Sequence, residues 1–140
     1  MTPQSEDPRI DEDALLDAAR TVMERAYSPY SGVRVGAALL DGEGRVSTGC
    51  NVENASYGLT ICAERNALAH AVAEGQGSFL AVAIVTNRDA VLMPCGACRQ
   101  VLSEFAPDLW VICTGAGGAV ERMRLGELLP RAFAKEDLSE

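Results

Sequence analysis

Hydrophobic residues near the start of the chain recur at helical spacing. Between residues 11 and 26, apolar positions three or four apart are separated by charged ones, which predicts an amphipathic helix. Its apolar face comprises Leu15, Leu16, Ala19, Val22, Met23 and Ala26. Residues 27–32 contain a proline and a glycine, and the residue before a proline avoids the helical region. We therefore expect this helix to end before the first strand.

The remainder of the chain alternates between patterns typical of strands and of helices. Five stretches have strand length and composition: 33–40, 45–50, 80–86, 109–114 and 119–123. The first two are joined by the turn Asp41-Gly42-Glu43-Gly44, which predicts a β-hairpin. The third and fourth are continuous apolar runs, as expected of strands covered on both faces. Further helices are predicted at 60–74, with Thr60 as its cap and Val72 on its inward face, at 97–105 and at 125–130.

The connection between the last two expected strands is very short. It consists of Gly115-Ala116-Gly117-Gly118. A parallel crossover needs a dozen or more residues, so these two strands must pair in the antiparallel sense.

Composition restricts the class of protein. At 140 residues the chain is expected to form one domain, residues 1–140, with residues 1–10 as a flexible, acidic N-terminal tail. No apolar run reaches the roughly 20 residues of a membrane span, and the first residues lack the features of a signal peptide. We therefore expect a cytoplasmic protein with no membrane partner, whose five cysteines are ligands or core residues and form no disulfides. A net charge of -8 without a Lys/Arg cluster argues against a nucleic-acid partner.

The candidate chemistry lies in two short stretches, Cys62-Ala63-Glu64-Arg65 and Pro94-Cys95-Gly96-Ala97-Cys98-Arg99-Gln100. Each precedes or opens an expected helix, where unpaired amides and the helix dipole favour thiolates. Three sulfur ligands leave a tetrahedral zinc with one open position, which distinguishes catalytic from closed structural sites. Glu64 is then placed to carry a proton beside the metal.

Two other classes of protein share parts of this pattern. Cys95 and Cys98 have the spacing of a redox dithiol that opens a helix after a strand. A structural zinc module would instead recruit Cys50 or Cys113 as a fourth ligand. Neither alternative gives Glu64 a role.

The two stretches resemble the zinc signature of the cytidine deaminase family, in particular its small free-nucleoside branch. The resemblance extends to Asn51-Val52-Glu53-Asn54-Ala55-Ser56-Tyr57, to Tyr30-Ser31 with the following Val35-Gly36-Ala37-Ala38, and to Glu127-Leu128-Leu129-Pro130 with Phe133. It implies an α/β fold of three α-β-α layers around a five-stranded mixed sheet, with the last two strands antiparallel. The implied reaction is the zinc-dependent hydrolysis of cytidine and 2'-deoxycytidine to uridine and 2'-deoxyuridine with release of ammonia, in pyrimidine salvage.

The resemblance also implies roles for the residues around the metal. Cys62, Cys95 and Cys98 bind one Zn²⁺ per subunit, and Glu64 moves protons between water, N3 of the cytosine ring and the departing amine. Three thiolates leave the zinc site negatively charged, which works against acidifying water. We expect Arg65 to offset this charge by hydrogen bonding to ligand sulfurs.

Substrate contacts are implied for Asn51 and Glu53 with the sugar, and for the backbone at Ala63 with the base. By this resemblance Phe133 closes the pocket of a neighbouring subunit and stacks on the base, and Tyr57 is a further substrate-binding or interface residue, so the family's homotetramer is implied. A carboxylate facing the sugar would repel a nearby phosphate, which argues for a nucleoside over a nucleotide. A bulkier cytosine compound, such as a nucleoside antibiotic, is the alternative substrate.

Overall fold

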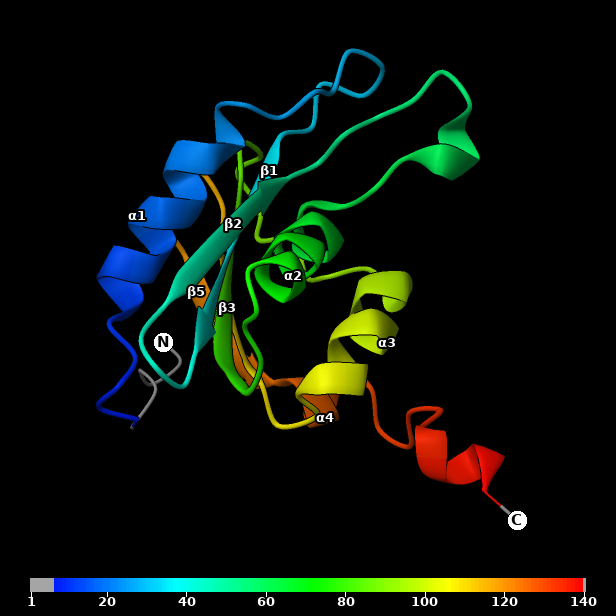
Figure 1. The fold of residues 1–140 in the computed structure, drawn as a ribbon. Helices are drawn as coiled ribbons and strands as arrows, with labels where there is room; N and C mark the ends of the chain where they lie inside the picture. Colours follow the sequence, from blue (N-terminus) through cyan, green and yellow to red (C-terminus); the bar gives the residue numbers. More distant parts are fainter. Residues whose placement is uncertain (1–6, 140) are drawn as a thin grey trace.

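The computed structural model describes residues 7–139, and the predicted three-layer α/β arrangement is present (Figure 1). One five-stranded mixed sheet is covered by α1 on one face and by α2, α3 and α4 on the other. The strands are β1 (Val35–Asp41), β2 (Val46–Cys50), β3 (Phe79–Thr86), β4 (Trp110–Thr114) and β5 (Val120–Arg124). The helices are α1 (Glu12–Met23), α2 (Ala63–Ala73), α3 (Gly96–Phe105) and α4 (Leu125–Leu128), with the 3₁₀ turns η1 (Tyr57–Leu59) and η2 (Lys135–Leu138).

The sheet has the strand order β2-β1-β3-β4-β5. β1 is antiparallel to both of its neighbours, and β4 and β5 are antiparallel as their short connector requires. β3 and β4 form the parallel pair, and α3 is the crossover between them. The loop that leaves β3 therefore leads directly into the start of α3, where two of the candidate ligands lie.

Alternate residues of the central strands enter two separate cores. Ala37, Leu39, Val82, Ile84 and Val111 face α2, α3 and α4, whereas Ala38, Leu40, Ala81, Ala83 and Ile112 face α1. All ten side chains are at most 6% exposed. Continuous apolar runs in β3 and β4 are thus explained by helices covering both faces of these strands.

Two helices differ from the sequence prediction. α2 does not start at Thr60, because Ile61 exchanges both backbone hydrogen bonds with Val52 and so remains extended. Thr60 instead accepts a hydrogen bond from the Asn54 amide, and Val72 is 45% exposed, so its predicted inward position is wrong. The last predicted helix, 125–130, shortens to the four residues of α4.

α2 lies very close to the edge strand β2. A Cβ added to Gly49 would come within 2.3 Å of the Ala67 nitrogen, so only glycine permits this approach. Asn66 Nδ2 also donates to the Cys50 carbonyl at 2.8 Å. These contacts bind the first turns of α2 to the end of β2, and the segment that continues from β2 begins with Asn51.

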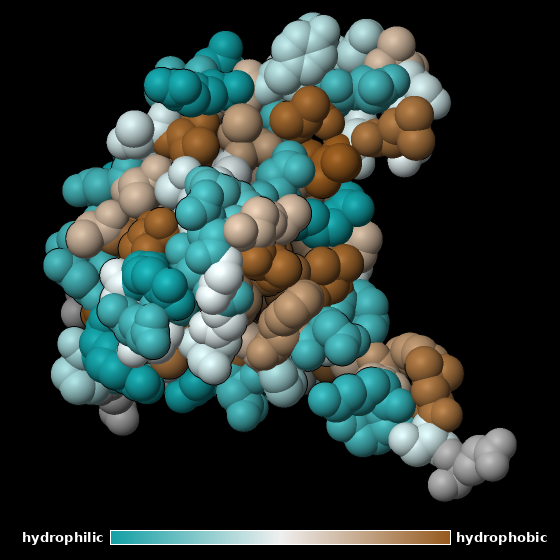
Figure 2. Space-filling view, viewed as in Figure 1, coloured by the Kyte–Doolittle hydropathy of each residue, from teal (hydrophilic) through white to brown (hydrophobic). Residues whose placement is uncertain are grey.

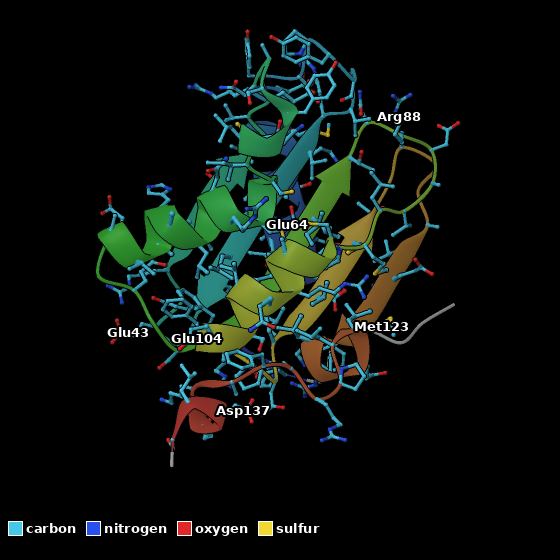
Figure 3. All side chains as sticks on the ribbon, turned by 90° about the vertical axis from the view of Figure 1, so that its right-hand side faces the viewer. Glu43, Glu64, Arg88, Glu104, Met123 and Asp137 are labelled. Carbon is cyan, nitrogen blue, oxygen red and sulfur yellow. The ribbon has the colours of Figure 1, made fainter. Side chains whose placement is uncertain are left out.

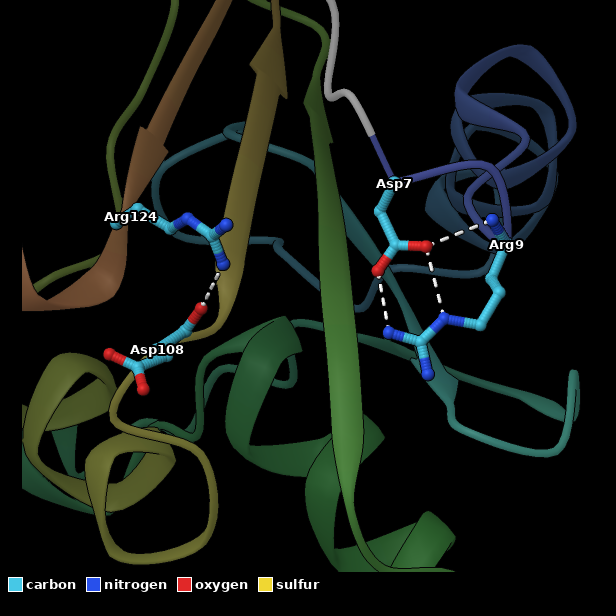
Figure 4. A network of polar contacts seen from close by, with 4 residues as sticks. All are labelled: Asp7, Arg9, Asp108 and Arg124. Carbon is cyan, nitrogen blue, oxygen red and sulfur yellow. Dashed lines mark hydrogen bonds and ion pairs between the residues drawn. The ribbon is translucent and has the colours of Figure 1, made fainter.

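Residues 7–11, before α1, include an ion pair and a buried apolar residue. Arg9 pairs with Asp7 (Figure 4). Ile10 is buried in the core beside α1. Nearby, Arg124 Nη1 donates to the Asp108 carbonyl, and its guanidinium lies 4.1 Å from the centre of the Trp110 ring. Residues 1–6 of the expected flexible tail lie outside the described residues. Within residues 7–139, no helix has the length and hydropathy needed to cross a bilayer.

Candidate metal centre

Two helix starts bring the three predicted zinc ligands to one point. Cys62 is the N-cap residue of α2, Cys95 is the N-cap residue of α3, and Cys98 lies in the first turn of α3. The Sγ atom of Cys95 is 3.7 Å from that of Cys62 and 3.6 Å from that of Cys98. All three sulfurs lie within 4.8 Å of one another. Both N-caps have extended backbones, which direct their side chains off the helix ends, as the prediction of two helix starts at one ion requires.

The geometry and chemistry of these donors fit zinc. Tetrahedral Zn–S bonds of about 2.3 Å place two sulfurs about 3.8 Å apart. The distances from Cys95 Sγ to the other two sulfurs are close to this value. Among residues 7–139 the group contains no fourth Cys, His, Asp or Glu ligand, and neither Cys50 nor Cys113 joins it. The structure thus provides a three-sulfur site, in contrast to the four-cysteine structural module considered above.

The electrostatics of the cluster favour thiolate at Cys62. Hydrogen bonds from Cys98 and from Arg65 lower the pKa of the Cys62 thiol to about 5. The pKa of Cys98 is raised, because it neighbours Cys62 and is desolvated by burial. Arg65 Nη2 donates to Cys62 Sγ at 3.5 Å, and its buried Nε has no hydrogen-bond partner within the described residues. Arg65 therefore lies against the Cys62 sulfur, and binding of a metal by these cysteines would displace the remaining thiol protons.

Glu64 is the second residue of α2 and is only 4% exposed. Figure 3 shows it near the middle of the molecule, where α2 and α3 approach one another. Burial raises the pKa of its carboxyl group, because removal from water disfavours the charged form. A buried carboxyl group with a raised pKa beside the cysteine cluster is suited to accept and return a proton.

The predicted sugar-binding segment starts beside this cluster. Val52 pairs with Ile61, so the residue before Glu53 lies opposite the residue before Cys62. Asn51 is 8% exposed, and its Oδ1 accepts from the Val35 amide at 2.8 Å. Its Nδ2 donates to the Val33 carbonyl at 2.8 Å. The Asn51 amide thus holds the start of β1 and keeps one N–H for another partner.

Glu53 faces a turn of the α1–β1 loop. Its Oε1 accepts from the amides of Tyr30 at 2.9 Å and Ser31 at 3.2 Å, and its Oε2 accepts from the Ser31 hydroxyl. The Ser31 hydrogen bond is the main reason that the pKa of Glu53 is lowered. A cavity of about 210 Å³ opens here, lined by Tyr30, Ser31, Glu53, Tyr57 and Thr60. Ser31 was not among the residues predicted for the site, although it stands in the Tyr30-Ser31 motif.

The remaining predicted residues lie at the start of α2 and on the surface. Ala63 is fully buried as the first residue of α2. Tyr57 is 73% exposed, and its ring centre lies 5.7 Å from that of Tyr30. Phe133 is 60% exposed on the C-terminal segment, outside the cavity that contains Glu53. The structure of one chain therefore brings Phe133 to neither the cysteine cluster nor the Glu53 cavity.

Two residues that follow Cys98 hold this C-terminal segment. Arg99 donates to the carbonyls of Pro94 at 2.7 Å and Leu128 at 2.9 Å. Gln100 Nε2 donates to the Phe133 carbonyl at 2.7 Å. Both residues stand in the zinc motif, but no role was predicted for them, because their partners Leu128 and Phe133 lie 29 and 33 positions away along the chain.

Several known proteins are similar to this chain in sequence and in fold. Residues 9–114 match the family described as the cytidine and deoxycytidylate deaminase zinc-binding region. The chain is 45% identical over 131 residues to a cytidine deaminase of Sporosarcina psychrophila, a match that covers 93% of this chain and 96% of that protein. It is 47% identical over 131 residues to a cytidine deaminase of Mycobacterium tuberculosis, covering 94% and 96% of the two chains.

A crystal structure of cytidine deaminase from Burkholderia pseudomallei superimposes with a TM-score of 0.85 at 50% identity. The superposition covers 89% of this chain and all of that one. The sequence signature, the fold and the three-sulfur centre thus agree. The chain belongs to the cytidine and deoxycytidylate deaminase family, whose zinc-binding region it contains.

Proposed function

We propose that this chain catalyses the hydrolytic deamination of cytidine and 2'-deoxycytidine, giving uridine or 2'-deoxyuridine and ammonia in pyrimidine salvage. The observation that carries the proposal is the three-sulfur cluster with the buried Glu64 beside its first ligand. The relatives named above support the choice of nucleoside. Glu53, a carboxylate in the adjoining cavity, supports a substrate without a phosphate close to it.

In this proposal, the thiolates of Cys62, Cys95 and Cys98 hold one zinc ion. Bound zinc with an open position acidifies a water molecule and so supplies the nucleophile. Glu64 would accept a proton from the attacking water and deliver it to N3 of the cytosine ring, which makes C4 more electrophilic, and the remaining hydroxide would add to C4. Glu64 would then take the proton of the new C4 hydroxyl and pass it to the exocyclic nitrogen, so that the C4–N bond breaks, ammonia leaves and the C4 carbonyl of the product forms.

The other predicted residues would orient the nucleoside. The backbone at Ala63 contacts the base, and the free N–H of Asn51 and the carboxylate of Glu53 bind sugar hydroxyls. A site that hydrogen-bonds a hydroxyl discriminates strongly against analogues that lack it. Tyr57 lines the same cavity as Glu53.

The direct test is a spectrophotometric assay of the purified protein on cytidine and 2'-deoxycytidine, with ammonia and zinc measured in parallel. We expect turnover of both nucleosides, one zinc per subunit and little activity on the 5'-monophosphates. Turnover confined to a bulkier cytosine compound would favour the alternative substrate, and zinc without any turnover would contradict the enzymatic role.

We further propose that Arg65 compensates the negative charge of the metal centre. Replacing Arg65 with Ala should weaken zinc binding and raise the pH at which kcat/KM levels off, because one positive charge near the thiolates is lost. Arg65→Lys keeps the charge and should shift the profile less. Titration with a zinc chelator and a pH profile from about pH 5 to 9 measure the two effects. Unchanged profiles and zinc content in Arg65→Ala would refute this role.

We propose a homotetramer in which neighbouring subunits complete each pocket. Large hydrophobic residues are exposed in two groups: Tyr27, Tyr30, Val52, Tyr57, Leu59 and Ile61 around η1, and Val101, Phe105, Phe133 and Leu138 around α3 and the C-terminal segment. Figure 2 shows hydrophobic surface on both sides of a recess between the loop that carries η1 and the C-terminal segment. Such patches mark interaction surfaces. Sedimentation of the purified protein measures the number of subunits.

The contribution of Phe133 to a neighbouring pocket can be tested by mixing subunits. Phe133→Ala should raise KM for cytidine about tenfold through lost stacking, whereas Leu138→Ala, on the same segment, should not. Co-expressing Phe133→Ala with Glu64→Gln should restore pockets with wild-type affinity, because some pockets receive Glu64 from one subunit and Phe133 from the other. Mixed oligomers with no gain over the separate variants would show that Phe133 acts within its own subunit or not at all.

We also propose that residues 1–140 act as one domain in the cytoplasm. All five strands of the described chain lie in a single sheet, which supports one folding unit. Cys50, Cys62, Cys95, Cys98 and Cys113 are all free thiols, which suits a reducing compartment.

A further inference from the structure

The orientation of the Glu53 carboxylate depends on hydrogen bonds from a turn in the α1–β1 loop. Both carboxylate oxygens of Glu53 accept hydrogen bonds from this turn, at Tyr30 and Ser31. Ser31 Oγ also accepts from the Val33 amide at 3.0 Å. Gly32 adopts a φ of 72°, so the backbone reverses sharply between these residues. Any displacement of this turn would move the donors that aim the Glu53 carboxylate.

The turn is held in place by the loop that leaves the central strand β3. Asn87 Nδ2 donates to the Gly32 carbonyl at 3.0 Å, and Asn87 Oδ1 accepts from the Arg34 amide at 2.9 Å. The Asn87 amide itself donates to the Arg34 carbonyl at 3.2 Å. One asparagine thus makes three hydrogen bonds to residues 32–34, two of them through its side chain.

The neighbouring residue adds a fourth contact. Arg88 Nη2 donates to the Ser31 carbonyl at 3.2 Å, and Figure 3 shows Arg88 on the loop that follows β3. Asn87 comes directly after Thr86, which is 2% exposed and pairs with Val35 inside the sheet. Asn87 and Arg88, together called the clamp below, are therefore anchored to the buried sheet, whereas the turn that they hold is exposed.

We infer that Asn87 is a positioning residue for the sugar pocket: through the Gly32–Arg34 backbone it holds the Tyr30–Ser31 turn, and thereby the Glu53 carboxylate. This inference rests on the proposed function, because it assigns Asn87 to the recognition of the substrate's sugar hydroxyls. The same turn carries Tyr30, whose ring lies against Tyr57 on the other wall of the cavity. Asn87 is accordingly a determinant of sugar selectivity and does not touch the reacting atoms.

The first test separates substrate binding from chemistry. Asn87→Ala removes both side-chain hydrogen bonds and should raise KM for cytidine about tenfold while kcat changes less than about twofold. Asn87→Asp keeps the acceptor for Arg34 but loses the donor to Gly32, so it should show an intermediate KM. Asp89→Ala is the matched control, because the Asp89 side chain makes no hydrogen bond within residues 7–139. Zinc content should be unchanged in all three variants.

A double-mutant cycle tests whether Asn87 acts through Glu53. In a Glu53→Ala background, Asn87→Ala should change kcat/KM less than about twofold, because the carboxylate that it positions is absent. Assays on cytidine analogues that lack single sugar hydroxyls should show the same pattern, with the Asn87→Ala effect lost for the hydroxyl that Glu53 binds. Equal losses with and without Glu53, or an unchanged KM in Asn87→Ala, would overturn the inference.

A readout independent of activity distinguishes this inference from the proposed function. Hydrogen exchange at the Tyr30 and Ser31 amides, which donate to Glu53, should accelerate about tenfold or more in Asn87→Ala and stay unchanged in Asp89→Ala. Unaltered protection of the Tyr30 and Ser31 amides in Asn87→Ala would contradict the positioning role even if the enzyme deaminates cytidine. Accelerated exchange in a protein that does not turn over or bind nucleosides would instead leave the clamp intact and contradict its link to the substrate.

Discussion

Glu64→Gln should lower kcat/KM for cytidine by about a thousandfold or more while zinc stays bound. The amide matches the carboxyl group in size but cannot accept or return a proton, and general acid–base catalysis contributes about 10² to 10⁴ in rate. Because Glu64 takes part in more than one proton transfer in the proposed reaction, we expect a rate loss in the upper part of that range. Because it is 4% exposed, no solvent molecule can readily replace it. Steady-state assays on cytidine with metal analysis measure the effect.

Glu74→Gln is the matched control, because Glu74 caps the other end of α2 and is exposed. It should retain full activity. Residual activity of Glu64→Gln above about a tenth of wild type, with zinc present, would mean that another group carries the proton.

The zinc-free protein offers a second measurement on the same variant. A raised Glu64 pKa means that the folded state holds the proton more tightly than the unfolded chain does. The stabilisation from this proton is therefore complete below the unfolded value of 4.5 and is lost as pH rises through the higher folded pKa. Glu64→Gln removes this dependence. The difference between the Tm of the variant and the Tm of the wild-type apoprotein should therefore shift in favour of the variant as pH rises. Parallel Tm curves between about pH 5 and 8 would contradict the raised pKa.

Cys98→Ala should abolish both stoichiometric zinc and activity. Removing one of three sulfurs leaves two protein ligands, too few for the three-ligand sites typical of catalytic zinc. The protein should also lose the stabilisation that metal binding gives the folded state, about 2.7 kcal/mol at a hundredfold excess of free zinc over Kd. Atomic absorption, the cytidine assay and thermal melts with and without chelator provide the measurements.

Cys113→Ala is its matched control, because Cys98 and Cys113 are both fully buried. Cys113 lies in β4 away from the cluster, so its replacement should cost about 1 kcal/mol of stability and leave one zinc per subunit. Loss of zinc from Cys113→Ala would indicate that Cys113 is a fourth ligand, as in the four-cysteine module. Full zinc content in Cys98→Ala would show that Cys98 is not a ligand.

Local patterns were sufficient for most of the elements. The pattern of polar and apolar positions predicted α1 and the five strands to within a few residues, and the four-residue connector determined that β4 and β5 are antiparallel. Predictions were wrong where a distant partner overruled a local preference. Thr60 has the side chain of an N-cap, but the Val52–Ile61 pairing keeps its surroundings extended and moves the helix start to Ala63.

For the site, residue type and spacing singled out the candidate residues but left three kinds of site open: a catalytic zinc centre, a redox dithiol and a closed zinc module. Cysteine has few uses in pairs next to helix starts, and a glutamate two positions after a cysteine has no purpose in a redox pair or a closed zinc module. Cys62, Glu64 and the Cys95–Cys98 pair were therefore candidates from residue type and spacing, and the resemblance to the deaminase zinc signature favoured a catalytic zinc centre with Arg65 beside its sulfurs.

What the sequence by itself determined is thus most of the elements and the residues that make up the candidate metal centre, because both can be read from short stretches of the chain. Only the tertiary structure decided how far the sulfurs stand apart, which turn aims Glu53, and that Asn87 holds this turn from a loop 55 positions beyond Gly32. The Glu53 and Asn87 contacts each join a side chain to backbone amides or carbonyls of a distant segment, and nearly every residue carries these backbone groups. Their partners are chosen by the packing of the sheet and leave no mark in the local pattern of side chains.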